Sequence, residues 1–415
     1  MKKKTKVVLI ISFIIILILI LMSFFFYQKE KEIKYKNKLL KDKKVVEKIK
    51  NHYNNYVITN KKSNLYIKDN NNYKKIGTVK ENKEFTLKKQ KINKDTKYFL
   101  IDNLNYYIKY EDVDKIDNLS ELDTRYKSYL PFNENIITKD KINLYKNNNL
   151  VYELKTKLDT PIIIKDDTSK YIEFDNELYL IKNEDIESTY QKENTNLKEA
   201  TSVPVTVYHF IYLEGDNSCN EVICHSEKQI RSHFNYLKEN NFFTITSKEL
   251  EWFIDKKVKL PEKSIQITID DGARAENFIP LLEEYKINAT LFLITGWYPK
   301  EKFSSPYLEI ASHTDNLHEG GKCPGDQGSP LKCLEKEILI NDLKTSRDKL
   351  DQTEAFCYPF YEYNNYSENI LKEVGFKTAY IGGMRKATPG INKYQIPRIT
   401  IMNDTTLNEY VKYVN

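Results

Sequence analysis

The sequence predicts a C-terminal α/β domain with parallel strands, preceded by small all-β segments and one apolar N-terminal helix. Three observations support this fold class. Strand-like and helix-like runs alternate from residue 203 onward, and short apolar runs recur between residues 56 and 187. No charged residue occurs between Val7 and Tyr27. The alternating region fits either a barrel or a doubly wound sheet.

A change in composition places a domain boundary near Thr201. The 415-residue chain holds 65 Lys+Arg and 59 Asp+Glu, and this small excess does not indicate nucleic-acid binding. The first 200 residues contain 40 of the basic and 29 of the acidic residues, whereas all five Cys follow residue 200. With 13% aromatic residues, the chain can build cores, which excludes wholesale disorder.

Residues 7–27 are expected to form a transmembrane anchor. At about 1.5 Å per residue they span about 31 Å, the thickness of a hydrocarbon core. The apolar run is too long for a cleavable signal peptide and lacks a small-residue cleavage site, and no face is polar as in a soluble helix. We expect residues 1–6 to be a cytoplasmic tail and the rest to lie outside a single-pass cell membrane protein. The lysines after the span leave the positive-inside rule undecided.

The region between anchor and boundary reads as a stalk and two β modules. Residues 28–55 are Lys-rich with scattered apolar positions, as in a helical stalk with a solvated face. Residues 56–118 and 130–187 show short apolar runs separated by Asn/Asp/Lys turns, and 188–202 reads as a linker. The first module resembles a bacterial Src-homology-type barrel, which implies a cell-wall polymer as partner. Similar strings at 107–113 and 179–186 indicate a degenerate tandem repeat.

Two motifs in the C-terminal region carry candidate chemistry. Asp270 and Asp271 end a predicted strand and point in different directions, so one carboxylate can bind a metal while the other acts as a base. An acidic turn before a helix is the alternative. His313 and His318 would diverge by about 140° on a regular helix, so they converge only at a strand end followed by a turn. The chain has six His, which favours a metal pair over two surface histidines.

The order of these motifs resembles the polysaccharide deacetylase family, the NodB-homology carbohydrate esterases. The resemblance rests on Thr268–Gly272, Ser312–His318 and Ala355–Phe360. A strand ending in Tyr208-His209 and the five-residue His spacing are similar to the branch that acts on biofilm poly-N-acetylglucosamine. The resemblance implies a distorted (β/α) barrel over residues 203–415 and a membrane-anchored enzyme that removes N-acetyl groups from an N-acetylated glycan polymer.

The resemblance also implies a role for each motif residue. Asp271, His313 and His318 would hold one divalent metal, with zinc expected. Asp270 would be the general base and His209 the general acid. The metal and the backbone N–H of Tyr358 would stabilise the oxyanion.

This chain departs from the family pattern at its third motif. Cys357 stands where the family has Arg, and Arg398 is the candidate that replaces it, with a surface salt bridge as the alternative. Trp297 or Tyr361 could form an aromatic wall of the site, although either could equally be core packing.

The cysteines bear on the compartment. Two short loops can close as disulfides in an oxidising space, Cys219 with Cys224 and Cys323 with Cys333, whereas Cys357 is expected to be a buried thiol. A four-Cys zinc site is the alternative, but the spacing is poor for it. Two other functions remain open: a peptidoglycan deacetylase, and a non-catalytic glycan-binding protein on the same fold.

Overall fold

The computed structural model describes the chain except residues 1, 71, 122, 193–196, 217 and 220. Part of the expected linker 188–202 and the first residue of the expected tail therefore lie outside the described residues. The chain divides into two compact units. The first comprises Met1–Asp123, Ile137–Leu158 and Phe174–Glu187, and the second Thr124–Ile136, Asp159–Glu173 and Ser188–Asn415.

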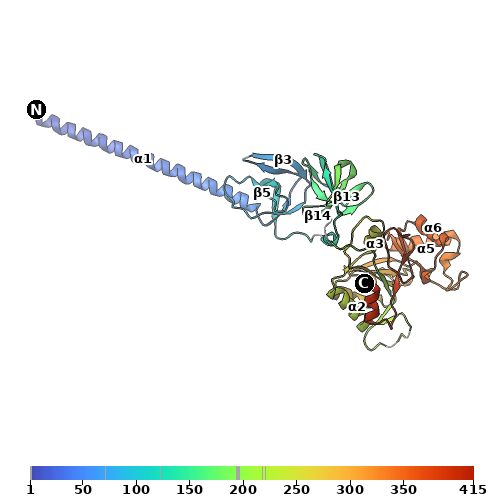
Figure 1. Ribbon diagram of the computed structural model, residues 1–415. Coiled ribbons are helices and arrows are strands. Elements are labelled where there is room, and N and C mark those ends of the chain that lie inside the picture. The colour runs from blue at the N-terminus through green and yellow to red at the C-terminus, as the bar shows by residue number, and fades with distance from the viewer. Residues whose placement is uncertain (1, 71, 122, 193–196, 217, 220) are drawn as a thin grey trace. The chain divides into compact units, whose positions relative to one another are not determined.

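The N-terminal segment is one long helix, α1 (Lys2–Asn51) (Figure 1). Its apolar part is long and apolar enough to cross a membrane, by length and composition. The side chains from Phe13 to Tyr27 are exposed. The helix continues through the Lys-rich segment without a break, so the expected stalk is helical up to Asn51.

The β region contains two sets of strands with matching order. In each set a three-stranded sheet places the first strand between two later ones, β4-β1-β7 and β11-β8-β15. In each set the last two strands are joined by a single 3-10 turn. The two sets, which we call the first and second β repeats, share this strand order, and their origin as a tandem repeat stays a prediction. The first set is β1 (Tyr56–Thr59), β2 (Ser63–Asp69), β3 (Asn72–Val79), β4 (Glu84–Thr86), β5 (Tyr98–Leu100), β6 (Tyr107–Lys109), η1 (Tyr110–Asp112) and β7 (Val113–Ile116). The second is β8 (Glu134–Thr138), β9 (Ile142–Lys146), β10 (Asn149–Leu154), β11 (Asp159–Pro161), β12 (Ile164–Lys165), β13 (Ser169–Phe174), β14 (Glu177–Lys182), η3 (Asn183–Asp185) and β15 (Ile186–Gln191).

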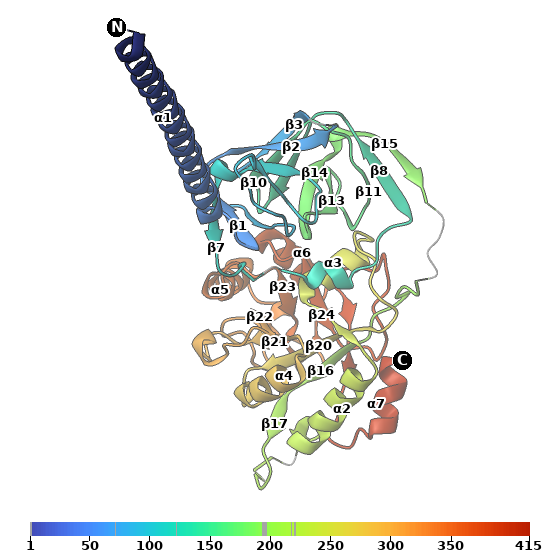
Figure 2. The ribbon, with the colours of Figure 1, turned by 90° about the vertical axis from the view of Figure 1, so that its left-hand side faces the viewer.

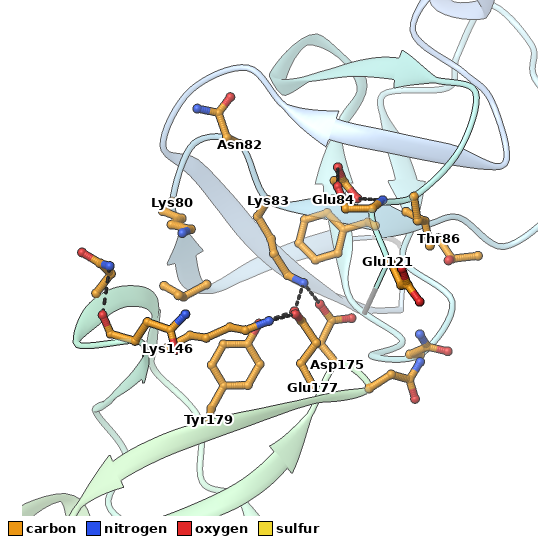
Figure 3. A pocket seen from close by; sticks show the side chains of 18 residues that line it. Lys80, Asn82, Lys83, Glu84, Thr86, Glu121, Lys146, Asp175, Glu177 and Tyr179 are labelled. Atoms are coloured by element: carbon orange, nitrogen blue, oxygen red, sulfur yellow. Dashed lines mark hydrogen bonds and ion pairs between the residues drawn. The ribbon is translucent and has the colours of Figure 1, made fainter. Parts of the chain in front are cut away.

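The two repeats join through β3 and β10, which pair antiparallel with Tyr152 opposite Val79. A cavity of about 450 Å³ adjoins this junction. Figure 3 shows Lys83 pointing into it between Asp175 and Glu177. The Lys83 ammonium lies 3.0 Å from Asp175 and also pairs with Glu177, which accepts a second ion pair from Lys146. The side chains of these three residues, Lys83, Asp175 and Glu177, are nearly buried. Their ion pairs therefore join the two repeats with little exposure to solvent.

Parts of the second β segment belong to the C-terminal unit. The segments 124–136 and 159–173 group with it rather than with the first unit. Leu130 and Ile164 form isolated bridges with Lys259 and Val258. Arg125, in η2 (Arg125–Ser128), pairs with the buried carboxylate of Glu249.

The C-terminal unit is built on a parallel sheet of order β25-β24-β23-β22-β21-β20-β16-β26, and β19 also pairs with β20. The edge strands β25 and β26 are separated in the chain by one residue, Arg398, so the sheet nearly closes into a barrel. The expected distorted barrel is confirmed. Its strands are β16 (Val205–Tyr208), β19 (Phe243–Thr244), β20 (Ser264–Asp271), β21 (Ala289–Leu293), β22 (Leu308–Ser312), β23 (Ala355–Cys357), β24 (Thr378–Ile381), β25 (Ile396–Pro397) and β26 (Ile399–Thr400). A separate two-stranded sheet pairs β17 (Phe210–Tyr212) with β18 (Cys224–Ser226).

Helices surround these strands in Figure 2. They are α2 (Glu227–Glu239), α3 (Ser247–Ile254), α4 (Ile279–Tyr285), α5 (Lys336–Lys349), α6 (Asn365–Val374) and α7 (Leu407–Val414), with the 3-10 turns η4 (Ala275–Phe278), η5 (Lys300–Lys302), η6 (Pro330–Lys332) and η7 (Pro359–Tyr361). The side chains of the central strand β20 alternate between its two faces, and both faces are buried. Ile265, Ile267 and Ile269 join the main hydrophobic core, whereas the buried Thr268 and Asp270 meet Arg398 on the other side.

Candidate active site

The carboxyl ends of neighbouring parallel strands bring the candidate residues together. Asp270 and Asp271 end β20, and the residues after β16 and β22 are His209 and His313. Cys357 ends β23. Because parallel strands all end at the same edge of a barrel, residues far apart in the sequence converge there.

Three of these side chains form a cluster suited to a metal ion. The Nε2 atoms of His313 and His318 each lie 3.4 Å from Oδ1 of Asp271, and the three ligand atoms all lie within 4.8 Å of one another. One hard oxygen and two imidazole nitrogens suit a divalent transition metal, and a three-ligand set leaves positions open for water and substrate. The donor set therefore fits the metal that the sequence motifs imply.

The ring of His313 is oriented by a backbone contact. Nδ1 of His313 donates to the carbonyl oxygen of Cys357 at 2.8 Å, which turns Nε2 toward Asp271. Burial and the nearby charge of His313 together lower the pKa of His318 to about 4, so His318 is neutral at neutral pH.

The backbone around the cluster adopts rare conformations. Asp271 and Thr314 have φ values of 75° and 79°, in the left-handed region that non-glycine residues seldom occupy. After Asp271 the chain needs Gly272, because a Cβ there would lie 2.6 Å from the side chain of Leu293. Such strain persists only where surrounding structure enforces it, and it is typical of functional sites.

Asp270 is bound by Arg398 rather than by the metal cluster. The guanidinium donates to both carboxylate oxygens, at 2.7 and 2.8 Å, and both side chains are almost completely buried. Burial by itself opposes ionisation of Asp270, but the Arg398 charge outweighs it and holds the Asp270 pKa well below its usual range. The alternative of a surface salt bridge does not fit the 0% exposure of Arg398.

Cys357 completes this buried group. Its thiol lies 3.5 Å from Oδ2 of Asp270, and Arg398 donates to its sulfur at 2.8 Å. Burial raises the pKa of Cys357, so it stays a thiol. Arg398, which lies between β25 and β26, therefore contacts both Asp270 and Cys357.

His209 lies beside Asp270. Its Nε2 atom is 4.0 Å from Oδ2 of Asp270, and its side chain is 13% exposed. Its Nδ1 atom is buried and has no hydrogen-bond partner among the described residues. His209 therefore presents Nε2 toward Asp270.

The expected oxyanion donor is not free. The Tyr358 N–H donates to the carbonyl oxygen of Tyr380 at 3.2 Å, which continues the pairing of β23 with β24. The role of this N–H toward an oxyanion stays a prediction. Of the two candidate wall residues, Trp297 is 48% exposed with its ring 5.8 Å from His318, whereas the Tyr361 ring packs against Arg398 at 5.0 Å.

The structure pairs the four loop cysteines as expected, Cys219 with Cys224 and Cys323 with Cys333, and leaves Cys357 free. The second disulfide closes a loop that follows His318 closely. Glu362 accepts backbone N–H groups of Gln327 and Ser329 in that loop, so one carboxylate fixes the loop beside the metal cluster.

One supporting residue was missed in the sequence. Asp342, on α5, accepts the backbone N–H groups of Asp315 and Asn316 at 2.9 and 2.7 Å, and so fixes the turn between the two histidines. Its sequence context is an ordinary helix, which carries no sign of this contact. His225 and His233 lie instead in a buried aromatic cluster with Tyr208 and Tyr410.

Residues 257–379 match the family model described as polysaccharide deacetylase. Poly-beta-1,6-N-acetyl-D-glucosamine N-deacetylase of Staphylococcus aureus is 29% identical over 218 residues, which cover 47% of this chain and 74% of the relative. The enzyme of the same name from Staphylococcus epidermidis is 27% identical over 203 residues, 43% of this chain and 68% of the relative. The family resemblance drawn from the motifs is confirmed.

Solved structures with a similar fold include a de-N-acetylase from Aggregatibacter actinomycetemcomitans, with 22% identity and a TM-score of 0.45. It covers 51% of this chain and 99% of its own. IcaB from Ammonifex degensii has 19% identity and a TM-score of 0.45, and covers 53% of this chain and 99% of its own.

Proposed function

We propose that the C-terminal part of this chain, whose residues 257–379 match the polysaccharide deacetylase model, hydrolyses N-acetyl groups of poly-N-acetylglucosamine with one bound divalent metal ion. The observation that carries the proposal is the convergence of Asp271, His313 and His318 beside Asp270 and His209. The substrate is inferred from the relatives, which are named for the β-1,6-linked polymer.

In this proposal Asp271, His313 and His318 hold the metal, with zinc expected from the two imidazoles. A dication bound there would supply Lewis-acid activation of water and of the acetamide carbonyl. Asp270 takes a proton from the water that attacks the carbonyl carbon. Arg398 keeps Asp270 ionised and oriented before this step.

His209 gives a proton to the nitrogen of the glucosamine as the carbon–nitrogen bond breaks. The products are acetate and a free amine on the polymer. Trp297, exposed beside His318, offers an aromatic face against which a sugar ring can lie.

Acetate release from a panel of glycans tests the substrate. We expect the full chain, in neutral detergent, to act on a β-1,6-linked N-acetylglucosamine pentamer and to leave the monosaccharide almost untouched. Asp351→Asn is the control for Asp270→Asn, because it makes the same chemical change at an exposed position distant from Asp270 in the sequence. Activity on peptidoglycan strands alone would reject the exopolysaccharide and support the alternative wall substrate.

We also propose that α1 anchors the chain in the cell membrane with the enzyme outside. Its apolar length and the two cysteine pairs support this placement, because disulfides persist in oxidising compartments. Protease added to intact cells should release the deacetylase domain. If the domain is cut only after the cells are broken open, the orientation is the reverse.

A further inference from the structure

One face of the first β repeat is made of tyrosine and lysine side chains. In the registers of β3, β2, β6 and β5, Tyr66 lies opposite both Lys75 and Tyr107, and Tyr98 lies opposite Lys109. Side chains at paired positions, and at every second residue along a strand, share a face. We call this surface the Tyr–Lys face: Tyr66, Lys68, Tyr73, Lys75, Tyr98, Tyr107 and Lys109.

The tyrosines of the Tyr–Lys face form one contiguous aromatic group. The Tyr73 and Tyr98 rings stack with centroids 4.0 Å apart, and Tyr66 and Tyr107 meet them edge-on at 5.0 and 5.1 Å. Tyr73, Tyr98 and Tyr107 are only half-buried. Their hydroxyl groups make no hydrogen bond to other residues in the described part of the chain. This group therefore presents apolar ring surface together with free polar tips.

The lysines around the rings carry unpaired charge. Lys68, Lys75 and Lys109 form no ion pair with any residue that the structure describes. Lys75 also lines a cavity of about 410 Å³ with three more lysines, and the one acidic residue of its lining, Glu153, is paired with Lys62. The other two lysines are Lys141 and Lys155. Excess positive charge thus extends from the Tyr–Lys face into this cavity.

We propose that the Tyr–Lys face and its lysine-lined cavity bind an anionic sugar polymer that carries phosphodiester groups. Sugar rings present apolar C–H surfaces that stack on tyrosine, and the lysines complement the phosphates. A neutral glycan would leave these charges without a counterpart. The product of the proposed deacetylation carries ammonium groups, which the lysines repel, so the polymer held here differs from the one modified.

The test measures binding of a fluorescent ribitol-phosphate polymer substituted with N-acetylglucosamine to the full chain in neutral detergent. Raising salt from 50 to 200 mM should weaken binding by about 50-fold if roughly four lysines contact phosphates. The triple variant Lys68→Gln/Lys75→Gln/Lys109→Gln should reduce the slope of the logarithm of the binding constant against the logarithm of the salt concentration by about 2. The matched control replaces three exposed loop lysines outside this face, Lys88, Lys89 and Lys91, by Gln.

Tyr73→Ala separates stacking from charge. Tyr73→Ala should lower the affinity for the sugar-bearing polymer about tenfold and leave the affinity for sugar-free polyphosphate unchanged. Tyr73→Phe should bind both with the affinity of the unchanged chain. Unchanged hydrogen exchange of the amides in β2, β3, β5 and β6 shows that each variant keeps the first β repeat folded. Equal losses in both lysine triplets would overturn the proposal. So would tight binding of a neutral pentamer, or binding of phosphatidylglycerol vesicles in preference to the polymer.

Discussion

Replacing Arg398 by Met tests whether this residue supports Asp270 as the structure indicates. Arg398 has 0% exposure and makes two hydrogen bonds to a carboxylate that is itself 2% exposed. The variant would leave that carboxylate buried and unpaired, at a cost of about 3–5 kcal/mol in the free energy of unfolding. Because the pair lowers the Asp270 pKa, its stabilisation exists above the ordinary Asp pKa and fades as the pH falls below that value. The deficit of the variant should therefore shrink in acid.

Tryptophan fluorescence provides the assay. Both Trp residues, Trp252 and Trp297, lie in the C-terminal unit, so denaturant titration followed by their emission reports on that unit. Arg398→Met/Asp270→Asn should recover at least about 2 kcal/mol relative to Arg398→Met, because it removes the stranded charge. Unchanged stability in Arg398→Met, or no recovery in the double variant, would refute the assignment of a buried ion pair.

Three further variants separate the remaining roles. Asp270→Asn should retain metal, measured by elemental analysis, and lose about 10²–10⁴-fold in turnover; loss of metal would mean that Asp270 and Asp271 exchange roles. His313→Ala should lose bound metal, and metal content equal to the unchanged chain would contradict the ligand set. Lys83→Met should destabilise the first unit, followed by hydrogen exchange, by about 3–5 kcal/mol at neutral pH. Lys146 and Lys83 outweigh burial and lower the Glu177 pKa to about 2, so this stabilisation is lost as pH falls from about 4.5 toward 2, and a deficit that grew in acid would contradict it.

The sequence by itself determined the features that depend on neighbouring residues. The apolar run of α1, the strand β20 with its two carboxylates and the closely spaced His313 and His318 all lie within short windows. Periodicity and turn residues act over such windows, so these elements could be predicted. The motifs also predicted the family, because their order along the chain is itself a signal.

Only the tertiary structure decided how distant groups are partnered. The sequence allowed two interpretations of Arg398, a partner of Asp270 or a surface salt bridge. Closure of the barrel through β25 and β26 places Arg398 against Asp270, 128 residues away. The same packing pairs the Tyr358 N–H with the carbonyl oxygen of Tyr380. It also lets Asp342 accept the backbone N–H of Asp315 in the turn between the two histidines. Strand register likewise assembles the Tyr–Lys face from four strands. Local propensity cannot encode these contacts, because a hydrogen bond or ion pair between remote residues depends on strand order and register in the folded chain.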